Sequence, residues 1–248
     1  MRLRALLWVI VALPFVLIAC TGGDEPPTSK IFRGAPWTGP ESYRYQLVQR
    51  THLYGYCELR TTPEVEPGRT LLERLCWDDS GFRDDGRVLV DSETLQPIET
   101  ERRNYDPERE RTAVRTAAYG EGSVLLAVDL GDEERSVTRE LPQPDERSPN
   151  PGWYDDESML WLVRGIPLEE GWSGAYHNVS VGTAQITVAE VRVLGRETVE
   201  VPAGTFDAWE IEIRSSITNR VWVNAEAPHQ VVRAQIERIT YELLPPEE

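Results

Sequence analysis

The sequence predicts a mainly β protein of the α+β class: a strongly curved antiparallel sheet, or half-barrel, with one short buried helix. Three observations support this prediction. Apolar and polar residues alternate with period two in many segments, for example in AWEIEIR at residues 208–214. The alternation changes phase in the runs 183–194 and 232–243, as a β-bulge in a bent strand would cause. A single apolar stretch, MLWLV at 159–163, breaks the pattern.

Short turn signals separate the alternating runs, so we expect mostly antiparallel strands, about ten to twelve of them between residues 43 and 243. Glycine-bearing hairpin turns are predicted at Asp85-Gly86, at 120–122 and at 131–132. The run PIETERRNY at 97–105 is polar on both faces, which is typical of an edge or solvent-facing strand.

The stretch VEVPAGTFDAWEIEI, at 199–213, joins two alternating runs through a tight reversal. Pro202 fixes φ, and Gly204 can adopt the backbone conformation that such a reversal needs. We expect Phe206, which follows at once, to pack back into the core and hold this corner.

A buried helix is expected over residues 155–165. Asp155 is a suitable N-cap for the apolar stretch, and Gly165 is a suitable residue to end it. A helix that is apolar all round must be buried, so this one should fill the concave side of the sheet. It follows a proline-rich crossing, LPQPDERSPNPG, at 141–152.

The first 19 residues are predicted to be an export signal. Arg2 and Arg4 precede an apolar region of about 14 residues, which is shorter than the roughly 20 that span a bilayer, so an uncleaved anchor helix is the disfavoured alternative. Leu17-Ile18-Ala19-Cys20 resembles the bacterial lipobox, and this resemblance implies that Cys20 is diacylated and becomes the mature N-terminus. Residues 20–40, rich in Gly and Pro, should form the lipidated cysteine and a flexible tether, followed by a single domain over 41–245.

The charge balance excludes some classes of partner. Without residues 1–19 the chain loses two arginines of its 26 basic residues, which leaves 24 against 42 acidic residues and a net charge of −18. Nucleic acids and anionic lipid headgroups would be repelled. We therefore expect contact with the membrane only through the lipid anchor. The export signal and lipobox predict an extracytoplasmic location in the cell envelope, and we expect a monomer.

Apart from Cys20 the chain has two cysteines, Cys57 and Cys76. An even number of cysteines in an exported chain favours a disulfide. Both lie in strand-like runs joined by the turn-rich TTPEVEPG, so a hairpin could place them side by side. The alternative is two free buried thiols.

Four segments resemble a family of uncharacterised bacterial envelope proteins with a domain of unknown function: SMLWLVRGIPLEEGW, VLGRETVEVPAGTFDAWEIEI, VWVNAEAPHQVVRAQI and, upstream, LVDSETLQPIETERR. The architecture of that family resembles the half-barrels of periplasmic lipoprotein carriers, whose concave apolar face holds acyl chains. The resemblance thus implies a half-barrel and no known chemistry. The acidic, proline-rich insert at 142–151 departs from the pattern and affects the rim of the half-barrel.

No catalytic constellation, metal site or cofactor is predicted. His52, His177 and His229 are far apart and lack metal-ligand spacing. GWSG at 171–174 is not a nucleophile elbow. The acidic doublets fall at expected turns and at the helix start, where Asp is common, and DDSGFRDDG lacks the spacing of a Ca²⁺ loop.

Apolar surface is the remaining candidate for a site. In a curved, open sheet some apolar side chains would line a concave cavity for a hydrophobic ligand; the candidates are Trp161, Trp209, Ile211, Ile213 and Trp222. The first hypothesis is a non-enzymatic, membrane-anchored lipoprotein that binds an apolar ligand or a lipidated partner there. The second is a structural or interaction module whose cavity is plugged by the helix, and the third is a hydrolase of cell-wall or glycan substrates.

Overall fold

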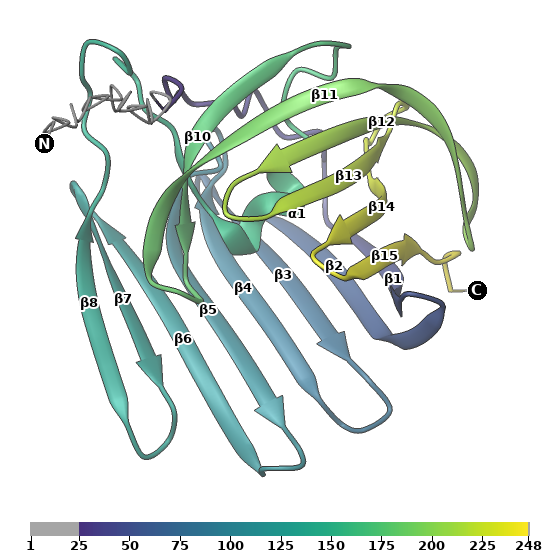
Figure 1. Cartoon of the computed structure of the whole chain (residues 1–248), viewed down its shortest axis with the longest axis horizontal. Helices are drawn as coiled ribbons and strands as arrows, with labels where there is room; N and C mark the ends of the chain where they lie inside the picture. The colour runs from purple at the N-terminus through teal and green to yellow at the C-terminus, as the bar shows by residue number, and fades with distance from the viewer. Residues whose placement is uncertain (1–24, 248) are drawn as a thin grey trace, which may run out of the picture.

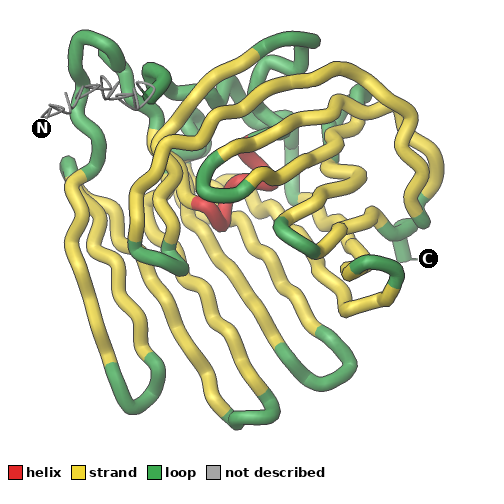
Figure 2. Tube along the Cα trace, viewed as in Figure 1, coloured by secondary structure: helices red, strands yellow, loops and turns green. Residues whose placement is uncertain are grey.

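The computed structural model describes residues 25–247. The predicted signal peptide and Cys20 lie outside the described residues. Fifteen strands form one strongly curved sheet that is not closed into a barrel, and a short helix lies inside the curve (Figures 1 and 2). The predicted fold class is confirmed, with fifteen strands in place of the ten to twelve expected.

The first half of the chain forms an antiparallel meander in which each strand pairs with the next. Its strands are β1 (Glu41–Gln49), β2 (His52–Glu66), β3 (Arg69–Trp77), β4 (Arg83–Asp91), β5 (Pro97–Asp106), β6 (Arg111–Gly120), β7 (Ser123–Asp129) and β8 (Glu134–Glu140).

The second half forms another meander, which pairs with the first through β1 and β15. Its elements are β9 (Trp153–Asp155), the 3-10 turn η1 (Asp156–Ser158), α1 (Met159–Leu162), β10 (Ser173–Ser180), β11 (Gln185–Val201), β12 (Gly204–Arg214), β13 (Thr218–Asn224), β14 (Val231–Ile236) and β15 (Ile239–Leu243). The two ends of the sheet are therefore β8 and β9, which are consecutive in the chain, whereas the first and last strands lie at its centre.

The two ends approach each other through side chains. β9 pairs in parallel with β10 and also contacts β5 and β6. There the ring of Trp153 stacks on that of Tyr119, with centroids 5.4 Å apart. A small apolar cluster joins β6 and β7 to the end of β10; its buried members are Ala117, Val124, Leu126, Leu141, Val179 and Val181.

Four of the predicted local features differ from the structure. Asp85-Gly86 is not a turn but lies inside β4. The polar run 97–105 is not an edge strand, because β5 pairs with β4 on one side and with β6 on the other. The run 232–243 is not one bulged strand but the hairpin of β14 and β15, with Glu237 at a φ of 54° in its turn. The bulge in β11 lies between Val193 and Gly195, just beyond the predicted phase change.

The predicted reversal after Val201 is confirmed. Val201 pairs with Gly204, whose φ of 132° favours glycine, and Phe206 is half-buried against the main core. The backbone N–H of Ala203 donates to the carbonyl of Leu243, 3.0 Å away. This corner therefore attaches the long β11–β12 hairpin to the C-terminal strand.

The predicted tether is wrong for residues 28–37. Ile31, Phe32 and Trp37 are buried in the main core. The backbone N–H groups of Ser29 and Arg33 donate to the carbonyls of Ala175 and Gly165, at 2.8 and 2.7 Å. Composition suggested a tether because the segment is rich in Gly and Pro, but its few large apolar side chains are enough to attach it to the sheet.

The predicted helix is present but shorter than expected. Asp155 caps it as predicted, since its carboxylate accepts a hydrogen bond from the Glu157 N–H at 2.9 Å. The segment comprises one 3-10 turn and the four residues of α1. Leu160, Trp161 and Leu162 are buried in the main core, so the helix occupies the concave side of the sheet as expected.

Candidate functional site

A cavity of ≈ 400 Å³ remains on the concave side, next to α1, and this volume lies within the range of small-molecule sites. A smaller space of ≈ 230 Å³ adjoins it and has Asp156, Met159, Ile217, Asn219 and Glu237 in common with it. The helix therefore fills only part of the concavity.

One wall of the larger cavity is apolar. It is formed by Met159 and Leu160 of the helix segment and by Ile236 and Ile239 of the β14–β15 hairpin. Ile217, in the β12–β13 turn, is exposed and lies where the two spaces meet. An apolar group could be buried between these side chains.

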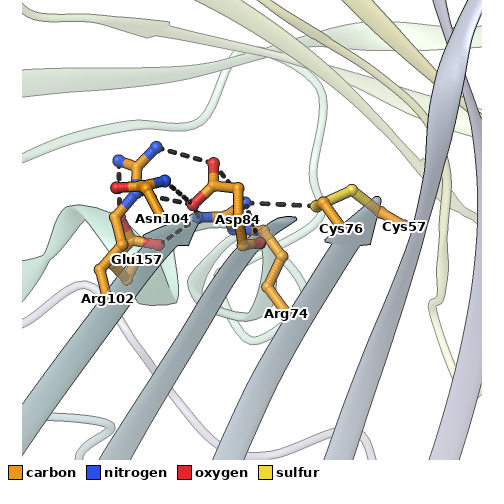
Figure 3. The surroundings of a disulfide bond; sticks show 7 residues. All are labelled: Cys57, Arg74, Cys76, Asp84, Arg102, Asn104 and Glu157. Atoms are coloured by element: carbon orange, nitrogen blue, oxygen red, sulfur yellow. Dashed lines mark hydrogen bonds and ion pairs between the residues drawn. A yellow bond between two sulfur atoms is a disulfide. The ribbon is translucent and has the colours of Figure 1, made fainter. Parts of the chain in front are cut away.

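The remaining lining includes a network of charged side chains from β3, β4, β5 and η1, here called the charged wall (Figure 3). Arg74 Nη2 donates to Glu157 Oε2 at 2.7 Å, and Arg102 Nη1 donates to Glu157 Oε1 at 3.0 Å. Both arginines also bind Asp84, with Arg102 Nε at 2.9 Å and Arg102 Nη2 at 2.8 Å from its oxygens. Asn104 Nδ2 donates to Asp84 Oδ1 at 2.6 Å.

Strand register explains why these residues meet. Arg74, Gly86 and Arg102 are cross-strand partners in one row, and Cys76, Asp84 and Asn104 form the next row on the same face. Gly86 leaves room between the two arginines, because a Cβ there would lie 2.8 Å from Glu157 Oε2. The carboxylate of η1 thus reaches down to the sheet through the space that this glycine leaves.

The disulfide lies beside this network. Cys57 and Cys76 are cross-strand partners in β2 and β3 and are bonded, which confirms the predicted pairing. Arg74 Nη1 lies 3.3 Å from Cys76 Sγ (Figure 3). The bond therefore fixes the strand pair from which Arg74 projects.

The network holds Asp84, Arg74 and Arg102 in the charged form. Burial alone would raise the pKa of Asp84, but the guanidiniums of Arg74 and Arg102 outweigh it and lower the pKa to about 2. Burial would lower the pKa of Arg74, yet Glu157 and Asp84 raise it well above its ordinary value. Two arginines and two carboxylates therefore balance each other.

Two neighbouring carboxyls, those of Asp155 and Asp156, have raised pKa values, in contrast to Asp84. Burial and the adjacent Asp156 raise the pKa of Asp155 well above its ordinary value. Asp155 Oδ2 accepts from Thr100 Oγ1 at 2.8 Å and from the Tyr119 hydroxyl at 2.5 Å, which links η1 to β5 and β6. Burial, followed by Glu157, raises the pKa of Asp156 to about 6. These two side chains form the polar attachment of the helix segment to the sheet.

The five predicted cavity residues are not gathered in one place. Ile213 lines the smaller space. Trp161 and Ile211 are buried in the core, where Trp161 Nε1 donates to Thr61 Oγ1 at 2.8 Å. Trp209 is half-buried beneath the guanidinium of Arg196, and Trp222 lies beneath that of Arg233.

Sequence reasoning missed the charged wall. Arg74, Asp84, Arg102 and Glu157 come from four separate segments with no motif between them. The signal that could have found them was the polar run 97–105, whose Arg102 and Asn104 face inward. An inward polar strand requires polar partners on the elements that cover it.

A second groove, of ≈ 500 Å³, lies at the open side of the sheet between β7–β8 and the β10–β11 turn. It is lined mainly by apolar residues such as Leu126, Val128 and Val137. The cavity next to α1 is the better candidate because several buried polar groups converge on it.

Neither a group of metal-binding side chains nor a helix that could cross a membrane is found in residues 25–247. No three His, Cys, Asp or Glu side chains of this part are placed to hold a metal ion. No helix in the same residues has the length and apolar character to cross a membrane.

Comparison with solved structures shows the fold. A β-barrel-like protein of the DUF1849 family from Brucella abortus superposes with a TM-score of 0.55 at 9% identity, covering 84% of this chain and 96% of its own. A protein from Bacteroides fragilis described as exported, with a YmcC-like fold, aligns with a TM-score of 0.30 at 13% identity, covering 88% of this chain and 100% of its own.

Comparison by sequence finds one family. The model of DUF3108, a protein of unknown function, matches residues 72–239, which is more than half of the chain. No curated protein matches the sequence. The matched region contains the whole charged wall and α1.

Proposed function

We propose a function for this chain, which belongs to the DUF3108 family of proteins of unknown function. It is a non-enzymatic, membrane-anchored protein of the cell envelope, and it binds a lipid-like ligand next to α1. The observation that carries the proposal is the cavity of ≈ 400 Å³ with an apolar wall on the concave side of the sheet. A structural module plugged by its helix would not need this remaining volume.

The composition of the cavity favours binding over catalysis. The acids and bases of the charged wall pair with each other: each arginine binds both Asp84 and Glu157. Asp84 and Glu157 each bind both arginines and so are not free to act on a substrate as the general base that acid–base catalysis requires.

The envelope location rests on the N-terminal sequence and on the disulfide. Cys57 and Cys76 are bonded, as is common in oxidising compartments. Leu17-Ile18-Ala19-Cys20 is the expected acylation site, with Cys20 attached to the membrane. Metabolic labelling with a fatty-acid analogue tests the anchor: label should be incorporated into the wild-type protein, and persistence of the label in Cys20→Ser would contradict it.

Ligand binding is tested by titrating the protein without residues 1–20, which keeps every described residue, with an uncharged environment-sensitive fluorescent lipid. Saturable binding is expected. Ile217→Glu should weaken it at least tenfold, because the substitution puts a charge where the two spaces meet. Ile217 is 41% exposed, so water can still reach the new carboxylate and the fold should survive.

Leu194→Glu is the matched control. Leu194 is also 41% exposed and lines neither of the two spaces, so this variant should bind like the wild type. Circular dichroism reports folding in each case. A folded wild-type protein that binds no lipid would favour the plugged structural module, whose support is the burial of Trp161 and Leu162 in the core.

A further inference from the structure

The part of the charged wall that a ligand can touch is a hydrogen-bond donor. The Arg102 side chain is 30% exposed, whereas Asp84 and Glu157 are 15% and 5% exposed. A guanidinium has five N–H groups, and Arg102 uses three of them, one on each nitrogen. One N–H on each terminal nitrogen therefore remains for an acceptor in the cavity.

The charge of the cavity disfavours an anion. Its lining includes three arginines, Arg74, Arg102 and Arg238, and four carboxyl side chains, Asp84, Asp156, Glu157 and Glu237. Both Arg74 and Arg102 are already balanced by Asp84 and Glu157. A ligand carboxylate or phosphate would add an unbalanced negative charge next to Asp156, and a buried like-charge pair is costly.

We infer, resting on the proposed function, that the ligand presents an uncharged carbonyl oxygen to Arg102: the cavity takes ester- or amide-linked acyl chains and discriminates against free fatty acids. The acyl chain lies against the apolar wall formed by α1 and the β14–β15 hairpin. The carbonyl faces the charged wall, where it accepts from the unused N–H groups of Arg102. Discrimination arises because both arginines of that wall are already paired with Asp84 and Glu157, and the lining as a whole has one more carboxyl than guanidinium.

Three ligands with the same ten-carbon chain separate these features: 1-decanoylglycerol, which has an ester carbonyl; 1-decylglycerol, an ether without one; and decanoate, an anion at pH 8. Calorimetric titration of the protein lacking residues 1–20 should show the ester binding about tenfold more tightly than the ether, as expected for a hydrogen bond to a charged donor. Decanoate should bind at least tenfold more weakly than the ester.

Arg102→Lys keeps the charge balance but removes the planar donor pair, so the preference for ester over ether should disappear while the affinity for the ether is unchanged. Arg87→Lys is the control, because Arg87 lies on the outer face of the neighbouring strand and also pairs with a glutamate, Glu73. Arg87→Lys should keep the preference.

The order of affinities on the wild-type protein decides the inference even if Arg102→Lys fails to fold. Equal binding of ester and ether, or decanoate binding as tightly as the ester, would overturn the inference and leave lipid binding in the cavity intact. Absence of binding by all three ligands would overturn the proposed function and the inference with it.

Discussion

Gly86 shows how one small residue determines the arrangement of the charged wall. It lies between Arg74 and Arg102 in a row of cross-strand partners, with the carboxylate of Glu157 directly above it. A larger residue would occupy the position where Glu157 bridges the two guanidiniums. The bridge is buried, and breaking a buried ion pair costs several kcal/mol.

Gly86→Ala should therefore destabilise the protein although alanine suits a strand better than glycine does. The new Cβ would lie 2.8 Å from Glu157 Oε2, so the carboxylate must move away from the two guanidiniums that hold it. The free energy of unfolding in urea should fall by about 1–3 kcal/mol, the usual range for overpacking.

Gly39→Ala is the matched control, because nothing lies within 4 Å of the position of its Cβ. It should change the free energy of unfolding by less than about 0.5 kcal/mol. If the two substitutions change the free energy of unfolding equally, the position of the Glu157 carboxylate does not depend on the absence of a side chain at Gly86.

The same residue shows a limit of the sequence analysis. Asp-Gly between alternating residues predicts a hairpin turn from local pattern alone. The competing requirement, room for a carboxylate from residue 157, comes from a segment more than 70 residues away. In the same way the run 97–105 was predicted to face solvent, although Arg102 and Asn104 face buried partners that local pattern does not reveal.

At the scale of elements, the short η1–α1 segment is attached to the sheet by polar groups at its start and by apolar groups along its length. Asp155 binds β5 and β6, Glu157 binds β3 and β5, and Trp161 binds Thr61 of β2. Asp156 accepts from the Val181 N–H, at 3.3 Å, just beyond the end of β10. Attachment of this segment should depend on pH because its carboxyls are buried together.

The sign of that dependence follows from Asp156. Its pKa rises from 3.8 to about 6 on folding, so the folded state binds the proton more tightly than the unfolded state does. This contribution to stability is complete below about pH 4 and is lost as the pH rises through about 6. The charged groups around Asp156 are Asp155 and Glu157 on its own segment and Arg102 on β5, with Tyr176 and Ser180 on β10.

Asp156→Asn should relieve this penalty. The free energy of unfolding of the variant minus that of the wild type should be about 2–3 kcal/mol larger at pH 8 than at pH 4. The hydrogen bond from the Val181 N–H is kept, because asparagine retains a side-chain oxygen. Urea denaturation at both pH values measures the difference, with Asp132→Asn, at an exposed site, as the control. A difference that does not change with pH would show that Asp156 is not destabilised by its charge.

The helix itself was predictable, but its length was not. Asp155 and the apolar stretch after it are local signals, and both are confirmed. α1 ends at Leu162, and residues near the N-terminus contact the chain just beyond it: the Arg33 N–H donates to the Gly165 carbonyl, and Phe32 packs against Gly165 so closely that a Cβ there would clash. Local pattern cannot show that a segment over 130 residues away contacts the chain there.

At the scale of the molecule, the curved antiparallel sheet was predictable because alternation, bulges and short turns are all encoded locally. The way in which the two ends of the sheet approach each other was not predictable. The sheet ends at β8 and β9 and leaves an open side, and residues 28–37 pack onto it. Both features depend on contacts between distant parts of the chain, such as Tyr119 with Trp153.

Binding of a lipid next to α1 is tested most directly by native mass spectrometry of the protein purified from membranes. The wild-type protein and Leu194→Glu should each retain one non-covalently bound lipid with an ester- or amide-linked acyl chain. Ile217→Glu should lose it, because its new charge lies at the cavity. A wild-type protein that retains no lipid, or an Ile217→Glu variant that retains as much as the wild type, would contradict a ligand site in this cavity.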